Sequence, residues 1–480
     1  MAVTTIATAA PARNSLIESA RHSAYGRTYR IAVMAVLSSF LLLAGGASRP
    51  DEIQQVAVRL AAIAAIVATL WPLQFGRLRA HRKFVAAVGA IYVLLLAQLI
   101  PLPPATWALL PGRAIYADIA EAAGAVTWRP LSLTPDLTIN VLFSLLPATA
   151  AGLAALYLES RQRLRVMGWI VAGACFSALL GLVQLGADGD ALHLFRQSSS
   201  DSAVGLFANR NHHAAFLACA LTLTGAVAGV RLHRGGGRRT SFVSLAVALL
   251  LLLSLLATGS RMALVLGPIG LLGAALCLRA SGQFAGRMSA RNWAAAAVSI
   301  SALLAVAALS ASRSGIFDRL AQTDAAAESR VAMLSPLVET ARAFMPWGSG
   351  FGSFDRVYRR FEPDELLSTI YMNQAHNEPL QLAIEGGLPA LALLALFLWW
   401  WTGSAIGILR FRLSSERKTM AIAAMVVTFM LMASSLVDYP LRTPLLGSVF
   451  IFSTVQMMRA RAAQRQLRDA GDSCASPGRS

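Results

Sequence analysis

The chain has 480 residues, of which 56% are hydrophobic and only 14% are charged, and its mean hydropathy is +0.58. Soluble domains carry more charge than this, so the composition indicates a polytopic membrane protein. Basic residues outnumber acidic ones by 42 to 24, which first suggests binding to nucleic acid. The distribution of these charges along the chain argues against that interpretation.

Twelve membrane-spanning helices are predicted, because many runs of about 18 to 20 nearly uncharged residues are long enough to cross a bilayer. The expected spans are 31–47, 54–73, 84–100, 140–158, 166–186, 212–230, 241–258, 262–278, 293–311, 387–409, 419–437 and 444–458. We therefore expect an all-α transmembrane bundle over 31–458, with cytoplasmic tails at 1–30 and 459–480.

Lys and Arg residues are concentrated in every second connecting segment. If the N-terminus is cytoplasmic, the seven cytoplasmic segments hold 27 of the 42 Lys and Arg residues. This is the positive-inside pattern, so topology explains the charge without nucleic acid.

The first 30 residues lack the apolar region of a cleavable signal peptide. We expect both termini in the cytoplasm, and we expect neither a disulfide nor a metal site, because no cysteine lies in an external loop and no Cys/His spacing fits.

The stretch GLFANRNHHAAFLACAL (205–221) opens the sixth expected span. Asn209, Arg210 and Asn211 stand there beside two histidines. Asn211 could cap the helix, but two amides, an arginine and two histidines in five residues exceed what capping requires. We interpret this loop as one that contacts sugar or phosphate; the alternative is a purely interfacial helix end.

Arg261 lies in the next external turn, within ATGSRMALVLGP (257–268). The turn is too short to leave the membrane surface. An arginine held there can bind the phosphate of a lipid ligand, or it can simply snorkel to any headgroup.

The external loop 312–386 spans about 75 residues, a length that indicates either function or disorder. Within it, ESRVAMLSPLVETARAF (328–344) predicts an amphipathic helix on the membrane surface or on the bundle, which Pro336 bends or starts. Its apolar positions are Val331, Leu334, Val338, Ala341 and Phe344. Arg330 on the polar side is a candidate phosphate ligand or a solvated charge. PWGSGFGSF (346–354) predicts a glycine turn, not a nucleotide site, since no strand precedes it.

The segment NQAHNEPLQLAIEGGLP (373–389) follows. Asn377 is a good N-cap and Glu378 suits a first turn, so a short helix over 378–385 is expected to end at the following Gly-Gly pair. His376 would then stand at a helix N-terminus, where a neutral imidazole can accept a proton from a hydroxyl group. The alternative is a histidine that only anchors the helix end.

Two further external stretches carry polar residues. In VDYPLRTP (437–444), Asp438 and Arg442 could pair with each other or orient the His376 helix. For this stretch, and for WRPLSLTPDLT (128–138), structural turns are the alternative.

Taken in order on a multi-helix chain, five of these motifs resemble the bacterial O-antigen ligase and O-antigen polymerase superfamily. They are GLFANRNHHAAFLA, TGSRMALVL, SRVAML with PWGSGFGSF, QAHNEPLQLAIEGGLPAL and VDYPLR, and they cover roughly residues 125 to 455. Each motif alone is weak. Five in order with matching topology are fairly specific.

The resemblance implies a metal-independent, cofactor-free glycosyltransferase facing the periplasm from the bacterial inner membrane. Such enzymes move a glycan from an undecaprenyl-pyrophosphate carrier to an acceptor hydroxyl, on lipid A core in the ligase branch of lipopolysaccharide biosynthesis. By motif position His376 would be the essential histidine, while Arg261 and Arg330 would hold the pyrophosphate. Family members often have Trp four residues after that loop arginine, where this chain departs from the pattern with Leu334.

Candidate donor and acceptor contacts are the polar residues near these groups: Arg210, Asn209, Asn211, Asn377 and Glu378. The expected partners are the lipid-linked glycan, its acceptor and membrane lipids. An O-antigen or exopolysaccharide polymerase using the same donor is the alternative, although one dominant loop with a single HNEPLQ motif favours a ligase. A transporter is a second alternative, but transporters keep ionisable residues deep in their spans, and only Arg59 lies within a span here. A non-catalytic scaffold is a third, and it leaves the His and Arg cluster without a purpose.

Overall fold

The computed structural model describes residues 10–49, 51–71, 79, 81–186, 192–196, 202–283, 332–367, 372–410 and 413–474. The expected span 293–311 and the candidate ligand Arg330 lie outside these residues.

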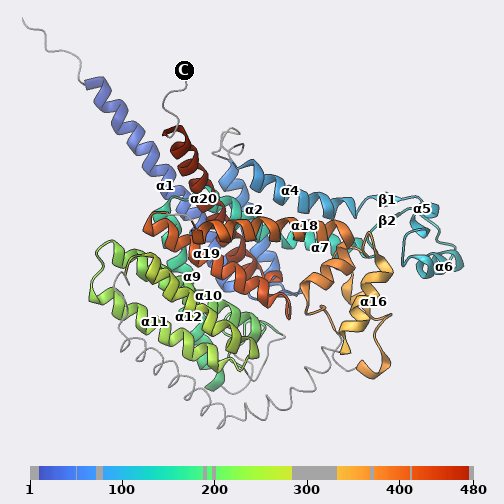
Figure 1. The fold of residues 1–480 in the computed structure, drawn as a ribbon. Helices are drawn as coiled ribbons and strands as arrows, with labels where there is room; N and C mark the ends of the chain where they lie inside the picture. Colours follow the sequence, from blue (N-terminus) through green and yellow to red (C-terminus); the bar gives the residue numbers. More distant parts are fainter. Residues whose placement is uncertain are drawn as a thin grey trace, which may run out of the picture.

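The described chain is almost entirely helical, with a single two-stranded sheet (Figure 1). Its long helices are α1 (Ala10–Ala44), α2 (Gln54–Leu70), α4 (Arg82–Ala97), α7 (Pro135–Ser144), α8 (Leu146–Tyr157), α9 (Ser160–Gly186), α10 (Arg210–His233), α11 (Arg238–Ala257), α12 (Arg261–Ala280), α16 (Leu334–Phe344), α18 (Glu378–Arg410), α19 (Ser415–Ser434) and α20 (Pro444–Cys474). Shorter elements are α5 (Pro104–Ala108), α6 (Ala114–Ala122), α17 (Phe354–Tyr358), η1 (Asp364–Leu366), η2 (Pro440–Arg442), β1 (Pro101–Leu102) and β2 (Arg129–Pro130).

Eleven of the twelve expected spans coincide with helices, and the twelfth is the undescribed 293–311. Among the described helices, eight candidates are long and apolar enough to cross a membrane. The expected all-α class is therefore confirmed, whereas the count of twelve spans remains a prediction. α10 lies at the centre, packed against α9, α11, α12 and α19, and nearly every residue of α10 from His212 to Val230 is buried.

Two expected boundaries differ from the structure. The span expected at 140–158 is broken at Leu145 into α7 and α8, because Pro147 in the first turn of α8 cannot continue the hydrogen-bond ladder of a preceding helix. α1 begins at Ala10 and α20 continues to Cys474, well beyond the apolar runs. The N-terminal part of α1 and the end of α20 project from the same side of the molecule (Figure 1).

The described part of the large loop forms a small core of its own, separate from the membrane core. The predicted amphipathic helix is present as α16, with Pro336 in its first turn, and it packs on α18. Its buried face is Leu337, Ala341 and Phe344, whereas Leu334, expected on that face, is 49% exposed. The helix therefore lies on protein, in one of the two positions expected for it.

The glycine turn after α16 locks into a break in α18. Gly387 has φ +60° and ψ −153°, so α18 is two helices joined at the predicted glycine pair. The N–H groups of Ser349 and Gly350 bind the carbonyls of Ile384 and Glu385 at 2.8 and 2.9 Å, which satisfies the end of the first half-helix. The glycine turn thus holds the end of the short helix that follows His376.

A buried arginine fixes that turn from the other side. Arg113 donates to the carbonyls of Leu131 and Gly348 at 2.6 and 3.1 Å and lies against the rings of Trp107 and Phe344. Burial lowers the pKa of Arg113 to about 10, so it stays charged at neutral pH. The 128–138 stretch is accordingly a structural element, as one interpretation expected.

Candidate active site

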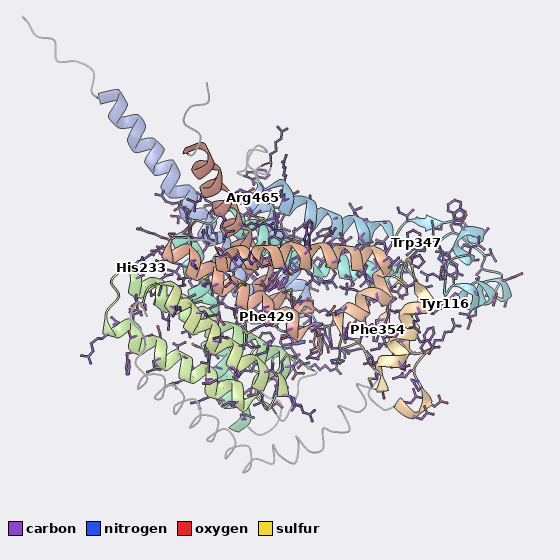
Figure 2. All side chains as sticks on the ribbon, in the orientation of Figure 1. Tyr116, His233, Trp347, Phe354, Phe429 and Arg465 are labelled. Atoms are coloured by element: carbon purple, nitrogen blue, oxygen red, sulfur yellow. The ribbon has the colours of Figure 1, made fainter. Side chains whose placement is uncertain are left out.

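Side-chain contacts join the starts of α10, α12 and α18 to the α19–α20 connection at one end of the bundle. This is the end that carries Trp347, and His233 at the C-terminus of α10 lies at the opposite end (Figure 2). Asn211 joins three of the segments. Its Oδ1 accepts from the Ser260 hydroxyl at 2.7 Å, and its Nδ2 donates to Oδ2 of Asp438 at 2.8 Å. Motifs far apart in the sequence therefore form one site.

Asp438 is the centre of the site, with a side chain only 1% exposed. Its Oδ1 lies 3.2 Å from Nδ1 of His376 and 3.7 Å from Nε2 of His212. The backbone N–H of Tyr439 donates to the same oxygen at 2.9 Å. The imidazole contacts have the distances of ion pairs, and neither is an aligned hydrogen bond. Such bonds often tighten only when substrate is bound.

Asp438 is ionised at neutral pH. Burial alone would raise its pKa, but the His212 and His376 imidazoles outweigh burial and hold the pKa well below its ordinary value of 3.8. The neighbouring phenol behaves oppositely, because burial and the charge of Asp438 raise the pKa of Tyr439 to about 12. Tyr439 therefore keeps its proton at neutral pH.

His376 is held in an unusual backbone conformation at the start of α18. Its φ is +48°, a region that non-glycine residues adopt rarely and only where the surroundings impose it. Asn377 caps the helix as predicted, since its Oδ1 accepts from the N–H of Leu380 at 3.1 Å. On the other side, the N–H of Ala375 donates to the side chain of Gln381 at 2.9 Å. The His376 side chain is 27% exposed, so a substrate can reach it.

Arg442 fastens the α19–α20 connection to the first half of α18. Its guanidinium binds both carboxylate oxygens of Glu378, at 2.6 and 3.1 Å, and lies 3.8 Å from the buried Glu385 carboxylate. Burial lowers the pKa of Arg442, but the two glutamates outweigh it and raise the pKa overall. The interpretation in which VDYPLR orients the His376 helix therefore agrees with the geometry. Glu378 is committed to this ion pair, and its contact with substrate stays a prediction.

Asn209, not Asn211, caps α10, because its Oδ1 accepts from the N–H of Asn211 at 2.7 Å. The expected capping role of Asn211 is wrong: its side chain turns inward to Asp438. Arg210 contacts the Ser202 hydroxyl at 3.4 Å. This loop is thus in part a scaffold for Asp438, and contact of Asn209 or Arg210 with a glycan remains a prediction.

Arg261 is the first residue of α12 and is exposed. Ser260 caps this helix, accepting from the N–H of Met262 at 3.2 Å while donating to Asn211. Arg261 therefore stands one residue from the hydrogen-bonded chain that leads to Asp438. A helix N-terminus favours anions, so Arg261 stands where a phosphate group of a substrate could bind.

His212 is the residue of this site whose direction the sequence analysis missed. It was grouped with a loop facing substrate, but its side chain is 2% exposed and turns to Asp438. Its neighbour His213 is also buried, with Nδ1 2.7 Å from the carbonyl of Ala203, and it supports the loop before α10. Within the described residues, no three His, Cys, Asp or Glu side chains are grouped as a metal site would need.

The fold and site define a multi-pass membrane protein with a charged, histidine-containing site at one end of its bundle. Residues 246–395 match the family model described as O-Antigen ligase. This match covers about a third of the chain and bears out the resemblance to the O-antigen ligase and polymerase superfamily, which implies a membrane glycosyltransferase with a lipid-linked glycan and a glycan acceptor as its substrates. A search of curated proteins found no match to the chain.

Proposed function

We propose that the protein transfers a glycan from an undecaprenyl-pyrophosphate carrier to an acceptor hydroxyl at the periplasmic face of the inner membrane, as an O-antigen ligase does. The carrying observation is the His376–Asp438 pair. A partly exposed imidazole backed by a buried carboxylate at 3.2 Å is the arrangement of a general base.

In the proposed reaction His376 acts through Nε2. Asp438 faces Nδ1, so it favours the tautomer with the proton on Nδ1 and leaves the Nε2 lone pair available. Nε2 takes the proton of the acceptor hydroxyl as its oxygen bonds to the anomeric carbon of the glycan. The bond from that carbon to the pyrophosphate breaks, and the pyrophosphate leaves with the electron pair. Asp438 stabilises the imidazolium that forms.

The leaving pyrophosphate is weakly basic, so the enzyme mainly has to bind its negative charge. We assign this task to Arg261 and Arg330, since a guanidinium binds phosphate oxygens in pairs and stays charged. The placement of Arg261 at the start of α12 supports its role. This chemistry needs neither a metal nor a nucleotide sugar.

The lipid tail of the donor needs an apolar path in the membrane. A groove of about 560 Å³ lies between α1 and α9, lined by apolar side chains that include Leu42, Trp169 and Phe176. Leu206, which also lines this groove, belongs to the segment that leads directly to Asn209. A tail lying in this groove would enter the site from the side of α10.

The test is the envelope glycolipid profile of a strain that lacks this gene, restored with the wild type or with His376→Ala. We expect long glycan to disappear from lipid A core, polymerised glycan to accumulate on its carrier, and only the wild type to restore transfer. Equal membrane levels of the two proteins are the control. Unchanged lipopolysaccharide would contradict a ligase, and single-repeat glycan in place of long chains would indicate a polymerase.

A further inference from the structure

Two imidazoles from different helices face the same oxygen of Asp438. His376 approaches Oδ1 from the start of α18, and His212 approaches it from the first turn of α10. The Tyr439 ring contacts both, with centroids 4.8 Å from His376 and 5.2 Å from His212. Nε2 of His212 has no hydrogen-bond partner within the part of the chain that the structure describes.

The acceptor capacity of this carboxylate is limited. Each carboxylate oxygen offers about two lone-pair sites. Oδ2 already accepts from Asn211, and Oδ1 already accepts from the N–H of Tyr439. The two histidines therefore compete for what remains on Oδ1, and His376 is the nearer by half an ångström.

We propose that His212 is a positioning residue that shares Asp438 with His376 and so limits how tightly His376 holds the proton it takes from the acceptor. This inference rests on the proposed function. During each transfer His376 gains a proton, and it must lose that proton to water before the next transfer. A carboxylate bound to His376 alone would hold the imidazolium more strongly and delay its release.

The sign of the effect is the same for either charge state of His212. As a neutral donor, His212 withdraws part of the negative charge of Asp438 from His376. As a cation, it would in addition repel a proton on His376. Removing His212 should therefore make His376 hold its proton more tightly.

Other charged groups around the site stay constant in this comparison. Arg442 is neutralised by Glu378 and Glu385, and Arg49, which acts on Tyr439, is paired with Asp51 at 3.0 Å. Among the described residues, the charged side chains in the first turns of α10 and α12 are Arg210 and Arg261. None of them is altered by substitution of His212.

The test is the dependence of the initial transfer rate on pH, measured with purified full-length protein and membranes of the deletion strain as the source of donor and acceptor. His212→Phe keeps a ring against Tyr439 but removes the donor. In this variant, the acidic limb of the curve of transfer rate against pH should move to higher pH by about half a unit or more, with activity retained on the alkaline side. His212→Gln, which keeps a neutral donor of similar reach, should return the limb most of the way to the wild-type position.

His213→Phe is the matched control, because His213 is an adjacent buried imidazole that bonds to Ala203 and not to Asp438. It can lower the amount of folded protein, but its acidic limb should coincide with that of the wild type. If His212→Phe does not accumulate, His212→Asn removes the same contact, because its shorter side chain cannot reach Asp438.

Superimposable profiles of the wild type and His212→Phe or His212→Asn would overturn the inference, as would an equal displacement in His213→Phe. Failure of the proposed function looks different. In that case the wild type itself transfers no glycan at any pH.

Discussion

Oδ1 of Asp438 lies 3.2 Å from Nδ1 of His376, although the two residues belong to the connection after α19 and to the start of α18. The carboxylate is buried and the imidazole is partly exposed. The imidazole of His376 is therefore the member of the pair that a substrate can contact, and the buried carboxylate of Asp438 provides a negative charge on its inner side.

Asp438→Asn should lower the transfer rate by about 100-fold or more, with little change in the amount of protein in the membrane. The amide keeps the shape of the carboxylate but not its charge, and it no longer selects the tautomer with a free Nε2. The measurement is the initial rate at saturating donor. A variant with more than half of the wild-type rate would remove Asp438 from the mechanism.

The same substitution has a consequence for stability in acid. The folded-state pKa of Asp438 lies well below the unfolded value, which is about 3.9. Its stabilising contribution is therefore fully present above about pH 4 and is lost as the pH falls through the folded-state pKa. Thermal unfolding of detergent-solubilised protein should show a gap between the wild type and Asp438→Asn that narrows as the pH falls below about 4. A gap that widens below that pH would contradict the assignment.

Arg442→Gln should destabilise the fold by about 3 to 5 kcal/mol, because it leaves the Glu385 carboxylate buried without a partner cation. The double variant Arg442→Gln/Glu385→Gln should regain a large part of that loss. Arg234→Gln provides the control. Arg234 forms an equally short ion pair with Glu416 at 2.6 Å, but both side chains are about one third exposed, so we expect a cost of only about 0 to 1 kcal/mol. Equal costs for Arg442→Gln and Arg234→Gln would show that burial does not matter here.

The features that sequence alone predicted are those set by neighbouring residues. Asn377 caps the helix after His376, and Gly387 breaks α18, because capping and a positive φ depend on local chemistry. The lengths of the hydrophobic runs likewise predicted the positions of most helices, because such a run is also a property of neighbouring residues. The break at Leu145 was not predicted, because the apolar run 140–158 continues through it and its length alone does not show that Pro147 ends the preceding helix.

The centre of the site was not predictable in this way. Asn209 and Asn211 both fit a capping position, and only the location of Asp438, 227 residues from Asn211, decides which one turns inward. The same holds for the direction of His212. A sequence shows that polar residues gather at helix ends, but the packing of α10 against the α19–α20 connection determines which of them meet.

Gly387→Ala should disrupt the contact between the glycine turn at 346–352 and the break in α18. An added Cβ would lie 2.1 Å from the carbonyl oxygen of Pro346, and the φ of +60° disfavours any side chain, so we expect a cost above about 1 kcal/mol. Faster proteolysis of the 346–352 turn and loss of transfer are the readouts. Gly168→Ala in α9, whose Cβ would meet nothing within 4 Å, should be neutral or slightly stabilising. Comparable proteolysis of both variants would refute the proposed locking of the turn into α18.

Arg261→Lys should lose most of the transfer activity, because an ammonium group is a point charge that cannot bind two phosphate oxygens in the way a guanidinium does. The effect should appear mainly as weaker use of the lipid-linked donor. Arg279→Lys is the matched control, since Arg279 is an exposed arginine in the last turn of the same helix, at the other end of the bundle. If Arg261 only snorkels to headgroups, lysine serves equally well and both variants will be fully active. Loss of activity in Arg261→Lys alone would assign the donor phosphates to the start of α12.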